Sequence, residues 1–133
     1  MGTKNYREKN YAAASGSWER LRTLKDVPPK FQELQTSANN NLGYLFYMGL
    51  GVDTNTKLAL QYWKVAYDAG HDESGYHLCH AYGDADRAEY SPRLALGYCK
   101  EALRRYQRAA DPEEVDAEVV KQIRKYVSRL EMR

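Results

Sequence analysis

Residues 42–52 read Leu-Gly-Tyr-Leu-Phe-Tyr-Met-Gly-Leu-Gly-Val, and residues 59–66 read Ala-Leu-Gln-Tyr-Trp-Lys-Val-Ala. A weaker copy follows 36 positions later without a gap, and it pairs Leu42 with Leu78, Phe46 with Tyr82, Tyr62 with Tyr98 and Ala66 with Ala102. A fixed period of roughly 20 to 50 residues is typical of stacked repeats, each of which buries its apolar face against a neighbour. The sequence therefore predicts an all-α fold, an alpha-alpha superhelix or solenoid.

The first copy resembles a Sel-one-like repeat, a relative of the tetratricopeptide repeat. That family's pattern runs Ala, Leu-Gly, aromatic, Gly-x-Gly-Val, Ala-Leu-x-aromatic-aromatic and a closing Gly, and residues 38–70 fill every position. Two departures are Phe46, where tyrosine is usual, and the swapped order of Tyr62 and Trp63. The resemblance implies a bacterial helical-repeat protein.

The second copy, residues 74–106, keeps the core of the pattern but loses its glycines. Other residues stand at the four glycine positions, namely Cys79, Ala85, Arg87 and Tyr106. We therefore expect the loop of this repeat to differ from that of the first. A partial echo at residues 11–21 resembles the second helix of a preceding unit, so the likeness covers about two thirds of the chain.

The chain is expected to form one domain of about six helices. They cover residues 4–25, 30–48, 55–69, 72–83, 92–109 and 111–131, grouped as an N-terminal helical region (4–36), repeat 1 (38–70), repeat 2 (74–106) and a capping helix (111–131). Apolar residues at helical spacing in the second helix are expected to be buried, namely Phe31, Leu34, Ala38, Leu42, Leu45 and Phe46.

Particular residues indicate the helix ends and contacts. Gly49 and Gly51 tolerate positive φ, which lets the chain reverse direction, and Gly43 lets the partner helix approach closely. Asn55, or its neighbours Asp53 and Thr54, can cap the third helix. Ser91 followed by Pro92 indicates the start of the fifth.

The last helix, opened by Asp111-Pro112-Glu113-Glu114, is charged except for one apolar line. That line consists of Val115, Val119, Ile123, Val127 and Leu130. A helix that is apolar on one side only can cover the exposed end of a repeat array. We interpret it as a capping helix.

The composition restricts the classes of partner. The chain has 20 Lys and Arg residues and 18 Asp and Glu residues, so no strong net charge favours binding to nucleic acid or to an anionic membrane. No stretch reaches the roughly 18 to 20 apolar residues of a membrane span. We expect a cytoplasmic protein, or a periplasmic one if a leader was removed.

Cys79 and Cys99 lie on different expected helices of repeat 2. We interpret them as buried thiols of a cytosolic protein. A cysteine-rich branch of the Sel-one-like repeat family links its hairpins by disulfides, but the cysteines of that branch stand at other positions of the repeat.

His71, His77 and His80 lie close together in the sequence, but a closed zinc site needs about four ligands. The sequence contains no nucleophile elbow, no Ser-His-Asp order, no paired carboxylates in an apolar setting and no Walker sequence. We therefore expect that the protein is not an enzyme and that it binds no metal and no cofactor. The most basic strip reads as a solvated face, and it consists of Lys100, Arg104, Arg105 and Arg108.

The resemblance also implies a binding face, because the first helix of each tetratricopeptide-type hairpin lines the concave side. Carried over to this chain, that face consists of Asn40, Tyr44 and Tyr47 in repeat 1 and Tyr76 and His80 in repeat 2, with Ser37 and Glu73 at the edge. Tyrosine offers contact area and an orienting hydroxyl, which suits a protein or peptide partner. The alternative is that these tyrosines pack between repeats.

We expect a non-enzymatic interaction scaffold or adaptor, monomeric or weakly dimeric. The resemblance also implies a more specific function, because compact proteins of this class serve as immunity proteins against a secreted toxin. We favour this specific form of the scaffold hypothesis. The alternative from another class is a small hydrolase or metal-dependent enzyme that uses His71, His77 and His80.

Overall fold

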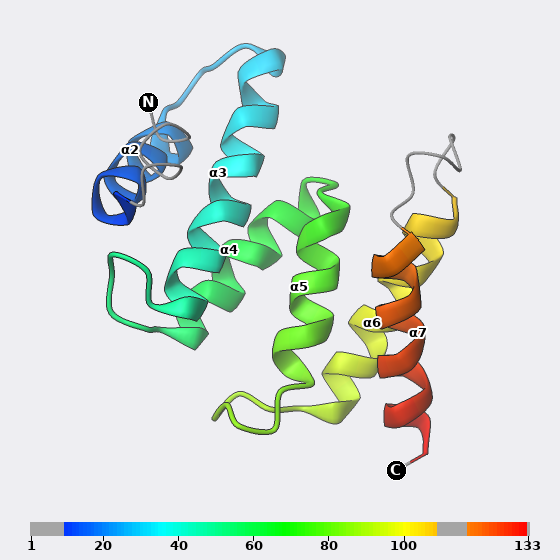
Figure 1. The fold of residues 1–133 in the computed structure, drawn as a ribbon. Coiled ribbons are helices and arrows are strands. Elements are labelled where there is room, and N and C mark those ends of the chain that lie inside the picture. Colours follow the sequence, from blue (N-terminus) through cyan, green and yellow to red (C-terminus); the bar gives the residue numbers. More distant parts are fainter. Residues whose placement is uncertain (1–9, 109–116, 133) are drawn as a thin grey trace. The chain divides into compact units, whose positions relative to one another are not determined.

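A computed structural model describes residues 10–108 and 117–132 of the chain. This part is all-α, as the sequence predicts, and Figure 1 shows its helices in order. They are α2 (Tyr11–Thr23), α3 (Pro29–Met48), α4 (Thr56–Asp68), α5 (Asp72–Tyr82), α6 (Pro92–Gln107) and α7 (Ala117–Glu131). The expected opening of the last helix at Asp111-Pro112-Glu113-Glu114 lies outside the described residues, as does Val115.

The chain divides into two compact units, Met1–His71 and Asp72–Arg133. In the first unit, α3 packs against both α2 and α4. In the second, α6 packs against both α5 and α7, and α7 also contacts α5. Each helix therefore packs against its neighbour in sequence within its own unit.

The helix ends follow the predicted signals. Gly49 ends α3 at φ 71°, and Gly51 at φ 73° continues the reversal. The side chain of Asn55 caps α4 by accepting from the backbone N–H of Leu58 at 3.0 Å. Ser91 caps α6 by accepting from Leu94 N–H at 3.3 Å. These local choices fix where each hairpin turns.

The core of the first unit lies where three helices meet. Its buried residues are Ala14, Trp18, Ala38, Leu42, Leu45 and Tyr62. The prediction that Phe31 and Leu34 are buried is wrong, because they are 41% and 50% exposed. With 20 residues, α3 is about 30 Å long, whereas α2 and α4, with 13 residues each, span about 20 Å. The first turns of α3 therefore extend beyond their neighbours.

Equivalent contacts occur within the hairpin α3–α4 and, 36 positions later, within the hairpin α5–α6. The backbone N–H of Asn55 donates to Phe46 O at 2.9 Å, and that of Ser91 donates to Tyr82 O at 2.9 Å. The Phe46 ring stacks on Tyr62 with centroids 5.6 Å apart. In the second hairpin Tyr82 stacks on Tyr98 at 5.7 Å. The two hairpins thus close in the same way.

One contact is made differently in the two hairpins. A Cβ added to Gly43 would lie 2.4 Å from Trp63 Nε1, so the glycine allows the close approach that we predicted. The equivalent residues of the second hairpin, Cys79 and Cys99, form a disulfide with a Cα–Cα distance of 4.7 Å. The interpretation of these cysteines as free thiols is therefore wrong. The same close helix approach that requires glycine in one hairpin brings two sulfur atoms within bonding distance in the other.

The loop of the second hairpin differs, as expected from its lost glycines. Between Gly83 and Ser91 no residue has positive φ. Instead, Arg87 N–H donates to Asp84 O at 3.1 Å, and the two side chains form an ion pair at 3.5 Å. After this hairpin, α7 buries Ile123 and Leu130, two members of its predicted apolar line.

Candidate interaction site

One side of α3 carries a line of side chains that are exposed or half-buried. We call it the α3 outer face, and it consists of Leu34, Ser37, Asn41, Tyr44 and Met48. Intervals of three and four residues place these side chains on one side of a helix. Leu34 and Met48 are each 50% exposed and Tyr44 is 36% exposed, whereas Ser37 and Asn41 are half-buried.

Two of the predicted binding residues on α3 are buried. Asn40 is 5% exposed, and its backbone carbonyl accepts from Trp63 Nε1 at 3.0 Å. Tyr47 is 6% exposed and packs on the Trp63 ring with centroids 5.4 Å apart. Their expected exposure is therefore wrong, because the large indole that fits against Gly43 also occupies this side of the helix. Of the predicted set on α3, Tyr44 and Ser37 remain accessible.

The other predicted binding residues lie on α5, in the second unit. Glu73 is exposed and pairs with His77, with Oε1 and Nε2 at 3.1 Å. Tyr76 is half-buried beside the His77 ring. His80 is exposed in part, and its Nδ1 hydrogen-bonds the hydroxyl of Tyr126 on α7. This group therefore forms a polar surface, in contrast to the more apolar α3 outer face.

His80 stands at a small hollow of about 320 Å³, which we call the His80 hollow. Its other lining residues include Asp84, Tyr90, Tyr126 and Arg129. The guanidinium of Arg129 lies 4.9 Å from the Tyr126 ring centroid. Burial lowers the pKa of His80, and burial raises the pKa of Tyr126. Both shifts favour the neutral forms, so the pair is an uncharged hydrogen-bonded contact near neutral pH.

The three histidines lie on two different segments of the chain. His71 follows α4 in the first unit, whereas His77 and His80 lie on α5 and contact Glu73 and Tyr126 respectively. Within residues 10–108 and 117–132, no group of three or more His, Cys, Asp or Glu residues is placed to hold a metal ion.

The predicted basic strip on α6 is largely paired with acids. Lys100 Nζ lies 3.2 Å from Glu131, Arg104 Nε donates to Glu101 at 2.9 Å, and Arg105 lies 3.6 Å from Asp72. The Glu101 carboxylate has a lowered pKa, chiefly because Arg104 donates to it. These pairs fit the interpretation of the strip as a solvated face.

Sequence reasoning missed Leu34 and Met48 as surface residues and Tyr126 as the partner of His80. Relative helix length would have indicated Leu34, because a helix longer than both neighbours leaves its end uncovered. No sequence signal identifies Tyr126, since its contact joins residues 46 positions apart on separate helices.

No protein-family model matches this chain, and no curated protein matches it at a significant level. In the part of the chain that the structure describes, none of the helices has the length and apolar character needed to cross a membrane.

Proposed function

We propose that this protein is a non-enzymatic interaction scaffold of the Sel-one-like repeat type, and that it binds a protein partner through the α3 outer face. The observation that carries the proposal is the line of Leu34, Tyr44 and Met48, three large side chains that are exposed on one side of α3. Large exposed apolar side chains on one side of a helix are suited to contact with another protein. Tyrosine and methionine are both enriched at such sites.

The repeat assignment is supported by the contacts that recur in the two hairpins. Both hairpins use the same stacked aromatic pair and the same backbone hydrogen bond at the start of the second helix. A repeat that cannot bury its own faces stacks on a neighbour, so we propose a solenoid arrangement.

The Cys79–Cys99 disulfide supports a proposal about the compartment. Disulfides persist in oxidising compartments and are rare in the cytosol. We therefore propose a periplasmic or otherwise exported protein in place of the cytoplasmic expectation. An immunity protein that neutralises a secreted toxin in the periplasm is the specific variant that this location suits.

The test is affinity capture of the tagged protein from its native host, with the double variant Tyr44→Ala and Met48→Ala. We expect partner binding to weaken by about 30-fold or more, because truncation of hot-spot residues costs at least about 2 kcal/mol. The matched control is Val65→Ala with Leu94→Ala, which removes exposed apolar side chains from other helices. If the α3 variant and the control retain the same partners at the same affinity, the proposal is wrong.

A catalytic alternative rests on the His80 hollow, where His80 and Tyr126 could exchange a proton beside Asp84 and Arg129. Its test is a panel of ester, lactam and peptidoglycan substrates with and without added zinc. Activity that is lost in His80→Ala and kept in His77→Ala would favour the enzyme over the scaffold.

A further inference from the structure

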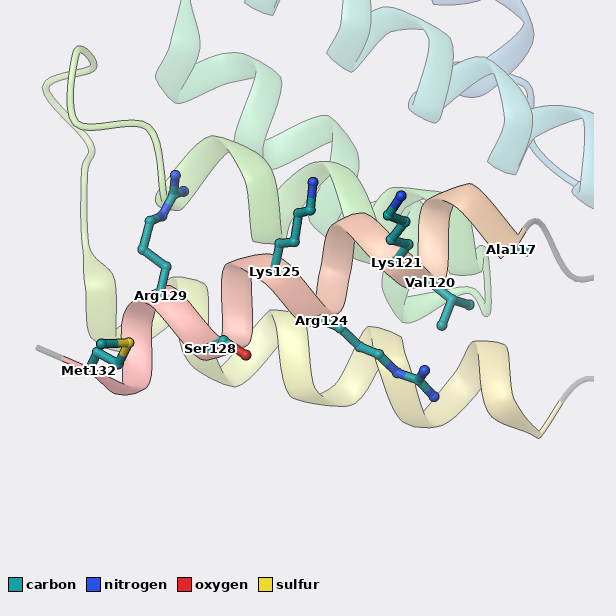
Figure 2. Close-up of a pocket in the computed structure, with 8 residues that line it drawn as sticks. All are labelled: Ala117, Val120, Lys121, Arg124, Lys125, Ser128, Arg129 and Met132. Atoms are coloured by element: carbon teal, nitrogen blue, oxygen red, sulfur yellow. The ribbon is translucent and has the colours of Figure 1, made fainter.

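The outward side of α7 carries an open hollow of about 790 Å³, which we call the α7 outer hollow. Figure 2 shows Lys121, Lys125 and Arg129 projecting to one side of the helix and Val120 and Arg124 to the other. The hollow lies between these two rows, and Met132 closes its C-terminal end. All of these residues belong to the second unit.

The charge of this surface is one-sided. Lys121, Lys125 and Arg129 follow one another at intervals of four, a spacing at which like charges destabilise a helix. Among the described residues, Lys121, Arg124 and Lys125 make no ion pair. The acids of α7 point elsewhere, because Glu131 pairs with Lys100 and Glu118 accepts from Gln122. The helix dipole favours Arg129 near the C-terminus, but it does not account for Lys121.

The hollow also has an apolar component. Met132 is 87% exposed, Val120 is half-buried, and the methylene stems of the lysines and arginines line the space between them. A complementary occupant would therefore carry carboxylates for the two rows and an apolar side chain for the centre.

Other polyanions fit less well. Single-stranded nucleic acid is held by aromatic side chains on which bases stack, and the hollow's lining has none. An anionic membrane is bound by amphipathic helices that insert their apolar side, but Ile123 and Leu130 of α7 are buried inside the protein.

We propose that the α7 outer hollow binds an acidic, amphipathic peptide segment of a partner protein. This surface is separate from the α3 outer face, and the proposal does not require that face to bind anything. Its cations would attract the segment, and Val120 and Met132 would contact the segment's apolar side chain.

The test uses a fluorescein-labelled peptide rich in glutamate and leucine, titrated with the intact protein and followed by anisotropy. We expect saturable binding that weakens with added salt and falls by about tenfold or more in Lys121→Glu/Arg124→Glu/Lys125→Glu. The matched control is Lys25→Glu/Lys57→Glu/Arg93→Glu, which changes the net charge equally at exposed sites and should retain binding. Circular dichroism checks that both variants fold, and Met132→Ser, which leaves the charge unchanged, should also weaken binding.

Four outcomes would overturn the proposal. One is equal binding by the α7 variant and the control, and another is no saturable binding of the peptide. A third is tighter binding of a thymidine oligonucleotide or of phosphatidylglycerol vesicles than of the peptide. The fourth is peptide binding only after the acids just before α7, Asp111, Glu113, Glu114 and Asp116, are neutralised, which would identify the protein's own chain as the occupant.

Discussion

The hairpins α3–α4 and α5–α6 share several internal contacts, but their two helices are held together differently. Both turn through the same backbone hydrogen bond and stack one aromatic pair. At the point of closest approach, the first hairpin places the Trp63 indole against Gly43, whereas the second joins Cys79 to Cys99. Two helices can thus be held close together in two ways. A large side chain can pack against a glycine, or two small side chains can form a disulfide.

Their outward faces also differ. Tyr44 on α3 and His80 on α5 occupy equivalent positions, and His80 is hydrogen-bonded to Tyr126 of α7, which packs against α5 within the second unit. Tyr44 lies on the α3 outer face, which also carries the exposed Leu34 and Met48. We assign partner binding to the first hairpin because these three side chains are exposed on one side of α3.

The largest expected effect is that of removing the indole from the first hairpin. Trp63→Ala should lower the free energy of unfolding by about 3–5 kcal/mol, because Trp63 is fully buried and donates a hydrogen bond to Asn40 O. Urea unfolding followed by circular dichroism measures this, with the exposed Val65→Ala as control. A loss no greater than that of the control would show that the indole does not fasten the hairpin.

Removing the disulfide should have the next largest effect. The cross-link joins residues separated by 20 positions, so Cys79→Ala/Cys99→Ala, or full reduction, should cost about 3 kcal/mol. Hydrogen exchange read by mass spectrometry should accelerate in α5 and α6 and stay unchanged in α3 and α4. Equal acceleration in both hairpins would contradict the assignment of the disulfide to the second hairpin alone.

A methyl group at the closest approach tests the geometry of the first hairpin. Gly43→Ala should cost about 1–3 kcal/mol, because the new Cβ would overlap the Trp63 ring. Gly97 on α6 is the matched control, since a Cβ there meets nothing within 4 Å. Gly97→Ala should stabilise the protein by roughly 0.5–1 kcal/mol. Thermal unfolding of the two variants should therefore shift in opposite directions.

The smallest effect concerns Tyr62, which hydrogen-bonds Glu19 on α2. Burial, together with this hydrogen bond, raises the pKa of Tyr62 from 10.0 to about 12. The unfolded chain loses this proton above pH 10 while the folded chain keeps it, so stability should fall between pH 10 and about 12. Tyr62→Phe should reduce that slope and cost about 1 kcal/mol at neutral pH. An unchanged alkaline slope in urea unfolding would show that Tyr62 does not cause it.

The sequence predicted most of the helices because their signals are local. Asn55, Ser91, Gly49 and Gly51 each act within a few residues of their own position. Gly43 was predicted correctly because its role follows from the repeat pattern.

The parts that were missed depend on contacts between helices. Whether Phe31 and Leu34 are buried depends on where α2 and α4 end, and whether Tyr47 is accessible depends on where the Trp63 ring lies. The disulfide was missed because Cys79 and Cys99 do not stand at the cysteine positions of the repeat family that the chain resembles, which left buried thiols as the interpretation. Cys99, the partner of Cys79, stands at the position equivalent to Trp63, and considering both positions together would have indicated contact.

The most direct test of this account is the redox state of Cys79 and Cys99 in protein taken from its native host without reductant. The sample is alkylated, digested and analysed by mass spectrometry. We predict one pair of peptides linked through the two cysteines and no alkylation of either residue. Full alkylation of both cysteines would contradict the disulfide between α5 and α6 and the proposed oxidising compartment.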